Sequence, residues 1–203
     1  MYTLYYMPGA CSRAIHALLN ELDVPVELVD RNQTDHFDHV NPMGQVPVLV
    51  DGDLVLREGV AIILYLLEKH NSAMLPAQQP ARARFLQQLL FANATMHPAY
   101  GRLFFISQAI TNEAAQKEAY EKAGAMISNL WATVEQHLER NRFMCGETPT
   151  VVDMMLAVYA NWGELFPVDI QLGPNVKALV ERVHAHPAFA RAVQIEEAQQ
   201  QAV

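Results

Sequence analysis

The sequence predicts a small α/β domain followed by an all-helical domain, and three observations lead to this fold class. Residues 2–69 alternate short apolar runs with amphipathic stretches, a pattern of mixed strands and helices. Residues 71–80 contain two prolines and little periodicity, which is typical of a linker. Beyond them almost every stretch has helical periodicity. We therefore expect one domain over residues 1–76 and a second over residues 77–203.

The α/β domain is expected to begin with a β-α-β unit. The aromatic run Tyr2–Tyr6 predicts a strand, which Pro8 and Gly9 end. Helical periodicity follows over Ser12–Leu22, and alternating apolar residues over Pro25–Asp30 predict a second strand. Because a helix separates the two strands and the connections are short, the strands are predicted to be parallel.

An antiparallel hairpin is expected next. Val46–Val50 is an apolar run and Leu54–Leu56 returns after Asp51-Gly52, a turn signal because glycine accepts a positive φ. A helix over Glu58–His70 follows. The expected order is β-α-β, a short helix as an option, and then β-β-α.

The helical domain is expected to be built around one buried helix. Thr150 and Asp153 have the spacing of a capping box, in which the side chain of each residue accepts a hydrogen bond from the backbone N–H of the other. The box opens Val151–Trp162, which is apolar on nearly every face and predicts a buried central helix. Further helices are expected over Arg82–Ala109, Glu113–Arg140, Pro174–His184 and Pro187–Ala198.

The composition limits the class of protein. The 203 residues are 51% hydrophobic and 18% charged, as in a globular protein. Because 14 Lys and Arg stand against 22 Asp and Glu, the net charge of −8 argues against nucleic acid as a partner. No apolar run reaches the roughly 18 residues of a membrane span, and the first residues lack the features of a signal peptide. We therefore expect a cytoplasmic protein with no membrane partner.

Cys11 is the first candidate for chemistry. It precedes the helix that begins at Ser12, where free N–H groups and the helix dipole favour a thiolate; the alternative is a small packing residue. The position three residues on is Ala14, so a dithiol motif is absent and redox chemistry would need an external thiol. Cys145 is expected to be structural, and two cysteines are too few for a disulfide scaffold.

Two further segments have the composition of a ligand site. Proline cannot donate a backbone hydrogen bond to a neighbouring strand, so Val46-Pro47 predicts a sheet edge or a special site. A cis bond before Pro47 would leave the Val46 backbone able to pair with an extended peptide. Glu58 and Gly59 open a helix, whose N-terminus can bind a carboxylate while Glu58 pairs with an amine. The alternative is that Glu58 only complements the helix dipole.

Two histidine pairs have ligand-like spacing. His36 and His39 lie three residues apart, and His184 and His186 two residues apart. No cysteine or carboxylate cluster accompanies them, so we interpret them as solvated histidines and expect no metal site.

Four segments in order resemble the cytosolic glutathione transferases, most closely the bacterial beta class. They are Tyr5–Ser12 (YYMPGACS), Asn41–Leu49 (NPMGQVPVL), Glu58–Leu66 (EGVAIILYL) and Cys145–Asp153 (CGETPTVVD). The resemblance implies a thioredoxin-like N-terminal domain, an all-helical C-terminal domain, a homodimer, and glutathione as co-substrate with no metal.

The resemblance also implies roles for single residues in glutathione binding. Pro47 is expected to be cis, and the backbone of Val46 to pair with the cysteinyl part of glutathione. Glu58 and Gly59 are expected to hold the γ-glutamyl group. Gln45 and Ala10 are expected to line the same site. The basic residue near the glycyl carboxylate is not placed by the resemblance, and Arg31 or His36 are its candidates.

Catalytic roles follow from the same resemblance. Cys11 is expected to lie against the glutathione sulfur and to be able to form a mixed disulfide with it, and His97 to face that sulfur as well. The alternative for His97 is a histidine of a helix face or the core. Tyr100, Phe104 and Trp162 are expected to line a pocket for an apolar second substrate, although aromatic residues at helical spacing are commonly core.

The predicted function is a glutathione S-transferase that conjugates the glutathione thiolate to electrophilic small molecules, with thiol–disulfide exchange through Cys11 as a further capability. Two alternatives stay open. One is a monothiol glutathione-dependent disulfide reductase or peroxidase that requires Cys11. The other is a non-catalytic binding module that keeps the fold.

Overall fold

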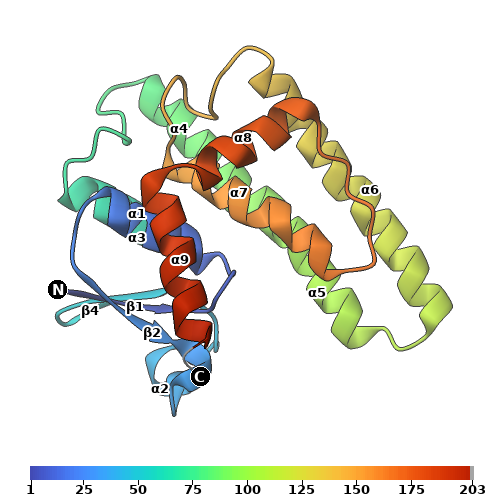
Figure 1. Cartoon of the computed structure of the whole chain (residues 1–203), viewed down its shortest axis with the longest axis horizontal. Coiled ribbons are helices and arrows are strands. Elements are labelled where there is room, and N and C mark those ends of the chain that lie inside the picture. The colour runs from blue at the N-terminus through green and yellow to red at the C-terminus, as the bar shows by residue number, and fades with distance from the viewer. Residues whose placement is uncertain (202–203) are drawn as a thin grey trace. The chain divides into compact units, whose positions relative to one another are not determined.

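The computed structural model describes residues 1–201, whose contacts group them into two compact units (Figure 1). The first unit contains Met1–Phe85 together with the segment that begins at His184. The second contains Leu86–Val183. The last helix of the chain, which the sequence analysis placed with the helical domain, therefore has its contacts with the α/β part.

A mixed sheet of four strands forms the first unit. The strands β1 (Tyr2–Tyr6), β2 (Val26–Asp30), β3 (Val48–Asp51) and β4 (Leu54–Leu56) lie in the order β2-β1-β3-β4. β1 and β2 are parallel, whereas β3 is antiparallel to both β1 and β4. The β-α-β unit and the hairpin are thus confirmed.

Helices complete this unit, and of these α1 and α3 pack on the strands. They are α1 (Ser12–Glu21), the 3-10 helix η1 (Arg31–Gln33), the short α2 (Phe37–Val40), α3 (Gly59–Lys69) and α9 (Pro187–Gln201). In Figure 1, α9 (red) runs beside α1, and these two helices pack on each other. The core of the unit includes Leu4, Tyr6, Ile15, Leu18, Leu49, Ile62 and Phe189, all 0–2% exposed.

The second unit consists of helices. After α4 (Ala81–Leu90), in which the boundary between the units falls, come the π-helical segment η2 (Phe91–Met96), α5 (His97–Ala109), α6 (Glu113–Leu138), α7 (Val151–Trp162), the 3-10 helix η3 (Gly163–Leu165) and α8 (Pro174–His184). A single α-helix over Arg82–Ala109 was expected. The structure instead changes to π-helix before Pro98, because proline has no N–H for the bond to the residue four positions earlier.

The capping box is confirmed at the start of α7. The Asp153 carboxylate accepts bonds from the Thr150 backbone N–H (2.8 Å) and hydroxyl (3.0 Å), and from the Met144 N–H (2.8 Å). Ten of the twelve residues of α7 are buried, so it is the expected central helix.

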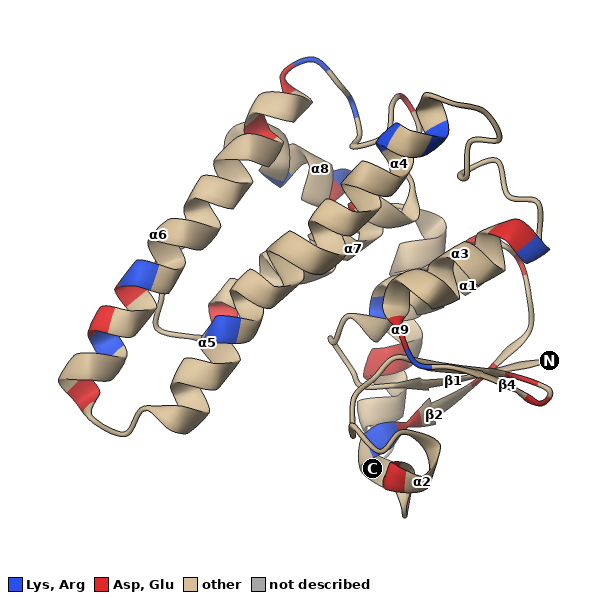
Figure 2. Cartoon of the chain, turned by 180° about the vertical axis from the view of Figure 1, so that it is seen from behind, with Lys and Arg blue, Asp and Glu red and all other residues tan. Residues whose placement is uncertain are grey.

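The surface of α6 carries charges of both signs. Acidic and basic positions are interspersed near its N-terminal end (Figure 2), and Lys122 forms an ion pair with Glu118 one turn away. None of the helices over residues 1–201 is both long enough and apolar enough to span a bilayer.

Candidate functional site

The register of the sheet brings three predicted segments to one edge. Tyr5 pairs with Val48, so two residues further Met7 comes alongside Val46. Leu49 pairs with Leu56, so two residues further Glu58 comes alongside Pro47. The loop that leads to Cys11, the Val46-Pro47 loop and the start of α3 therefore meet beside one another.

Cys11 lies at the N-cap of α1 and is half-buried. Its Sγ donates to the Val46 carbonyl oxygen at 3.6 Å, which joins two of the three segments directly. Burial raises the pKa of the Cys11 thiol to about 11, although the N–H groups of Cys11 and Ser12 lower it. Desolvation therefore outweighs the helix terminus, which the sequence analysis expected to favour the thiolate. Cys11 is a hydrogen-bond donor at neutral pH.

Local bonds shape the loop that presents Cys11. Gly9 has φ +71°, a left-handed conformation that favours glycine. The Ser12 hydroxyl, fully buried, lies 3.2 Å from the Met7 nitrogen and 3.3 Å from the Met7 oxygen. The half-buried Ala10 donates its N–H to the same Met7 oxygen at 3.1 Å. Met7 thus anchors both ends of the turn.

A buried carboxylate also holds this loop. Glu196 of α9 is 0% exposed and accepts bonds from the Gly9 N–H (3.1 Å) and Arg13 Nε (2.8 Å). His16 Nδ1 lies 3.5 Å from its other oxygen. The sequence analysis missed Glu196. Its signal was the spacing of Ala188, Ala192 and Glu196, which places the carboxylate on the buried face of α9.

The Val46-Pro47 bond is cis, as the resemblance implied. The buried Asn41 shapes the loop before it: its Nδ2 donates to the Gln45 oxygen (2.7 Å), and its Oδ1 accepts from the Met43 N–H (3.2 Å). The Gln45 side chain is exposed at this edge. In the part of the chain that the structure describes, no hydrogen bond engages the Val46 N–H.

Glu58 and Gly59 stand at the start of α3, where the sequence analysis expected them. Glu58 is the N-cap residue and its backbone oxygen accepts the first helical bond from Ile62. Its side chain is exposed and bonds to no other group among residues 1–201. A carboxylate is therefore available beside the N–H groups of a helix terminus.

Arg31 brings a positive charge to the same part of the unit. Its guanidinium donates to Met7 Sδ at 3.5 Å and lies over the Phe37 ring, 5.9 Å from the centroid. Arg31 also lies close to Gly44, since a Cβ atom built on this glycine would be 3.6 Å from Arg31 Nη2. Arg31 thus lies between the loop of Met7 and that of Gly44, and makes no ion pair with the carboxylates of the described chain.

In the second unit, His97 begins α5 and contacts an aromatic cluster. Its ring lies edge-on to Tyr159 (5.4 Å between centroids) and Trp162 (5.3 Å). Burial lowers the pKa of His97, so the neutral imidazole is favoured.

The three predicted pocket residues meet in this cluster but differ in exposure. The rings of Tyr100 and Phe104 lie edge-on to Trp162 at 6.0 and 5.9 Å. Tyr100 is fully buried and its hydroxyl accepts the Trp131 N–H at 2.8 Å. Trp162 is 7% exposed and Phe104 37%. In this structure, Phe104 presents the largest surface of the three to solvent.

The family of the chain follows from comparison with known proteins. The model of the glutathione S-transferase N-terminal domain matches residues 4–77, and that of the C-terminal domain matches residues 62–187. The chain belongs to the glutathione S-transferase family.

Individual relatives agree with this assignment. Glutathione S-transferase GST-4.5 of Xanthomonas campestris is 30% identical over 199 residues, 95% of this chain and 98% of its own. The structure of a transferase from Xylella fastidiosa has a TM-score of 0.88 at 27% identity, covering 97% of this chain and 99% of that one.

Two solved structures come from sphingomonads. A transferase complexed with glutathione is 29% identical, and a beta-class enzyme of Sphingomonas chungbukensis 28% identical. Each has a TM-score of 0.82 and covers 96% of this chain and 98% of its own. The thioredoxin-like fold, the helical second part and the likeness to the beta class are thereby confirmed.

Proposed function

We propose that this transferase conjugates the thiolate of glutathione to electrophilic small molecules, and that the Cys11 thiol donates a hydrogen bond to that thiolate. One observation carries the proposal: the Cys11 S–H points at the Val46 carbonyl, on the loop expected to pair with the cysteinyl residue of glutathione. When glutathione binds, its sulfur replaces the carbonyl as acceptor.

The remaining groups of glutathione have matching partners at this edge. The Val46 N–H, which has no partner in the described chain, pairs with the cysteinyl backbone. Glu58 binds the ammonium group of the γ-glutamyl residue, and the backbone N–H groups at the start of α3, from Gly59 on, bind the carboxylate of that residue. Arg31 takes the glycyl carboxylate, because it is a cation without an ion pair in residues 1–201. Gln45 and Ala10 line the same site.

The chemical step needs glutathione as an anion. A donated hydrogen bond favours the thiolate, and each unit by which its pKa falls is worth about 1.4 kcal/mol. The thiolate sulfur then forms a bond to the electrophilic carbon, and the leaving group departs with its electron pair. Cys11 keeps its proton throughout.

The test compares Cys11→Ala with the matched variant Cys145→Ala. Calorimetry measures glutathione binding, and ultraviolet absorbance against pH measures the pKa of the bound thiol. A chlorodinitrobenzene serves as electrophile. Cys11→Ala should still bind glutathione but raise the bound thiol pKa by about one unit, which slows conjugation at pH 6.5 about tenfold. Wild-type protein that binds no glutathione would overturn the proposal.

The same variant separates the alternatives. A monothiol reductase would lose all activity on replacing Cys11, and the pKa of about 11 makes that thiol a weak nucleophile in the glutathione-free protein. A binding module would bind glutathione without turnover. Partial conjugation by Cys11→Ala is the result that supports the transferase.

His97 is proposed as a second group that acts on the glutathione sulfur. Support comes from the resemblance and from burial that favours its neutral imidazole, which can donate one hydrogen bond. His97→Gln should raise the bound thiol pKa, and His97→Gln combined with Cys11→Ala should raise it further. His137, which bonds to the Met144 oxygen, is the control position.

We also propose that the protein acts as a cytoplasmic homodimer. The two cysteines are free thiols, as expected in a reducing compartment that supplies glutathione. The second unit exposes the large apolar side chains of Leu90 (48%) and Phe105 (67%). Sedimentation analysis at micromolar concentration checks the oligomeric state, and a monomer would contradict it.

A further inference from the structure

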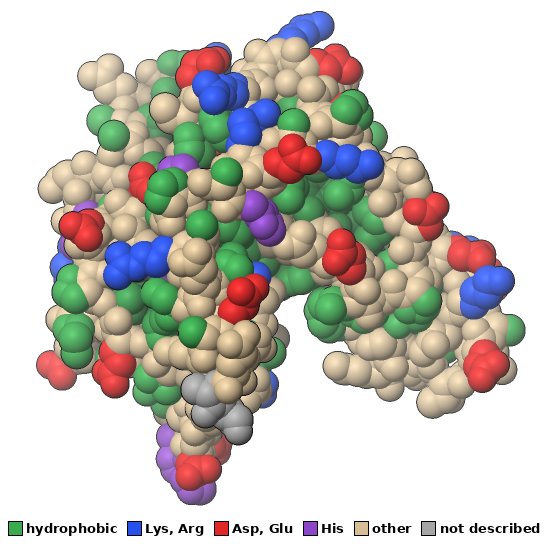
Figure 3. All heavy atoms as spheres, in the orientation of Figure 1, with side chains coloured by type: hydrophobic (Ala, Val, Ile, Leu, Met, Phe, Trp, Pro, Cys, Tyr) green, Lys and Arg blue, Asp and Glu red, His purple; other side chains and the backbone are tan. Residues whose placement is uncertain are grey.

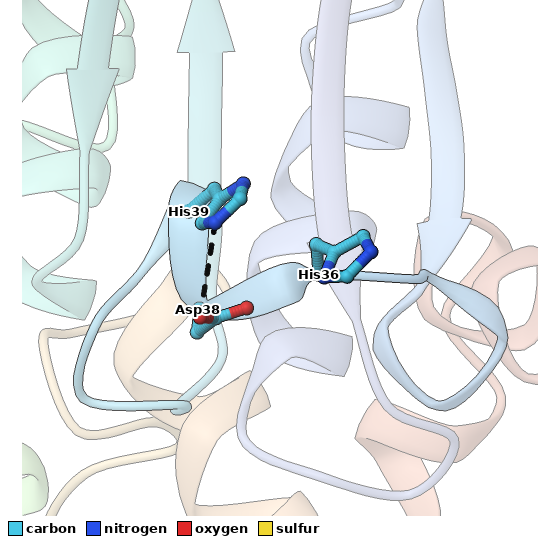
Figure 4. Close-up of side chains that lie close together, drawn as sticks. All are labelled: His36, Asp38 and His39. Atoms are coloured by element: carbon cyan, nitrogen blue, oxygen red, sulfur yellow. Dashed lines mark ion pairs between the residues drawn. The ribbon is translucent and has the colours of Figure 1, made fainter.

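A group of metal-ligating side chains lies on the first unit, on α2 and the residue before it. One ligand atom from each of His36, Asp38 and His39 lies within 4.8 Å of the other two. Histidine and acidic side chains gather on the surface over α2 (Figure 3), and the close-up shows these three together (Figure 4). We propose that His36, Asp38 and His39 bind a divalent transition-metal ion of the Ni²⁺, Cu²⁺ and Zn²⁺ class.

The three side chains lie close to the spacing that one shared ion requires. His36 and His39 are three residues apart and their rings stack, 5.4 Å between centroids with planes 14° apart. Asp38 Oδ2 lies 4.0 Å from His39 Nε2. Bonds of about 2.1 Å to a shared ion require ligand atoms no more than about 4.2 Å apart. Rotation of exposed side chains closes the remaining gap without moving the backbone.

The ligand set selects the class of metal. Two imidazole nitrogens and one carboxylate oxygen suit borderline divalent ions, whereas Mg²⁺ and Ca²⁺ prefer all-oxygen sites. Three protein ligands leave positions for water. The side chains of His39 and Asp38 are 78% and 70% exposed, so the ion reaches the site directly from solvent. The sequence analysis expected no metal site because no cysteine or carboxylate cluster accompanies the histidine pair; the structure places the single carboxylate of Asp38 beside it.

The backbone beneath these ligands is fixed. Phe37, between His36 and Asp38, is 7% exposed and packs on Tyr5 with ring centroids 5.5 Å apart. The Arg31 guanidinium also lies over the Phe37 ring, 5.9 Å from its centroid. Because the main chain is already held in place by Phe37, metal binding has to order only the exposed side chains.

The experiment uses the full chain without an affinity tag, in buffer free of chelators and of glutathione, which itself binds these metals. Calorimetry with Ni²⁺ should give one site, and Mg²⁺ should give none. His36→Gln and His39→Gln should each weaken Ni²⁺ binding at least tenfold, and Asp38→Asn about threefold. His184→Gln, from the other closely spaced pair, should bind Ni²⁺ as the wild type does.

A second readout needs no variant. Paramagnetic Ni²⁺ at substoichiometric concentration should broaden the amide resonances of residues 35–40 before any others. Circular dichroism checks that each variant is folded. Unchanged Ni²⁺ affinity in folded His36→Gln/His39→Gln, or first broadening near Cys11 or Cys145, would overturn the proposal. Because neither readout involves glutathione, its outcome is independent of the proposed conjugation activity.

Discussion

At the scale of single residues, the protonation state of Cys11 decides its chemistry. A thiol at a helix N-terminus gains from the dipole, but this one is half-buried and already bonded to a carbonyl oxygen. Since desolvation penalises only the charged form, the proton stays on sulfur. The residue is thus suited to donate a hydrogen bond rather than to attack.

The first prediction concerns the reactivity of Cys11 in glutathione-free protein. With a pKa of about 11, only about one thiol in ten thousand is ionised at pH 7. The rate of alkylation by iodoacetamide should therefore rise about tenfold per pH unit from pH 7 to pH 10. Mass spectrometry of the peptide that contains Cys11 measures the rate. A plateau at or below pH 9 would contradict the raised pKa.

The second prediction concerns Arg31 and the glycyl carboxylate. Arg31→Gln should weaken glutathione binding about tenfold, because a charge-assisted bidentate contact is lost. The same variant should bind γ-glutamylcysteine, which lacks the glycine, as well as the wild type does. Arg57, whose guanidinium bonds to the Val40 oxygen, provides the matched control Arg57→Gln. Equal losses of affinity for both ligands would show that Arg31 does not contact the glycyl carboxylate.

At the scale of elements, α9 is joined to α1 by packing and by one buried charge. Glu196 meets Arg13, Gly9 and His16 from a position with no access to solvent, whereas the side chain of Arg13 is 15% exposed. A buried carboxylate is costly unless it is paired, and here the Gly9 N–H and Arg13 Nε both bond to one oxygen of Glu196, Oε2. The Cys11 loop is therefore held by a helix that lies far away in the sequence.

The third prediction is that Glu196→Gln costs about 2–3 kcal/mol of unfolding free energy, because Arg13 loses its partner while the volume is kept. Urea denaturation followed by circular dichroism measures the loss. The adjacent exposed residue gives the control Glu197→Gln, which should change stability by less than about 0.5 kcal/mol. An unchanged free energy of unfolding in Glu196→Gln would show that the ion pair only offsets the cost of desolvating its charges.

At the scale of the whole molecule, the first compact unit is discontinuous in sequence. The segment that begins at His184 packs with Met1–Phe85, and the buried face of α9 includes Ala188, Phe189 and Ala192. Asn20 of α1 also bonds to the Ala188 oxygen at 3.1 Å. Removal of α9 would leave the outer face of α1 in water.

The fourth prediction follows from this arrangement. A fragment of residues 1–85 should not fold alone, because it lacks the helix that covers α1 and the carboxylate that holds the Cys11 loop. Addition of a peptide of residues 184–201 should restore dispersed amide resonances in nuclear magnetic resonance spectra. The same peptide with Glu196→Ala should restore them less well. A folded fragment without the peptide would refute the prediction.

The sequence by itself determined the element types and their order. Period-two and period-3.6 patterns depend on neighbouring residues, so β1, β4, α7 and α8 coincide with their predicted ranges. The ends of most other elements shift by a few residues, and the stretch predicted over Arg82–Ala109 is divided by the π-helical segment. It also indicated the segments of the proposed glutathione site, because the motifs around Cys11, Pro47 and Glu58 are local. The π-helical segment before Pro98 was not predicted, because the helical periodicity of Arg82–Ala109 continues through it.

The tertiary structure alone decided the rest. Whether Cys11 is ionised depends on the atoms around its sulfur, and those come from α1 and the Val46 loop together. Glu196, Arg31 and Asn41 act on the site through contacts that no local pattern encodes. Burial and electrostatics are properties of three-dimensional neighbours, so a sequence shows which residues are available, and only the fold shows which of them meet.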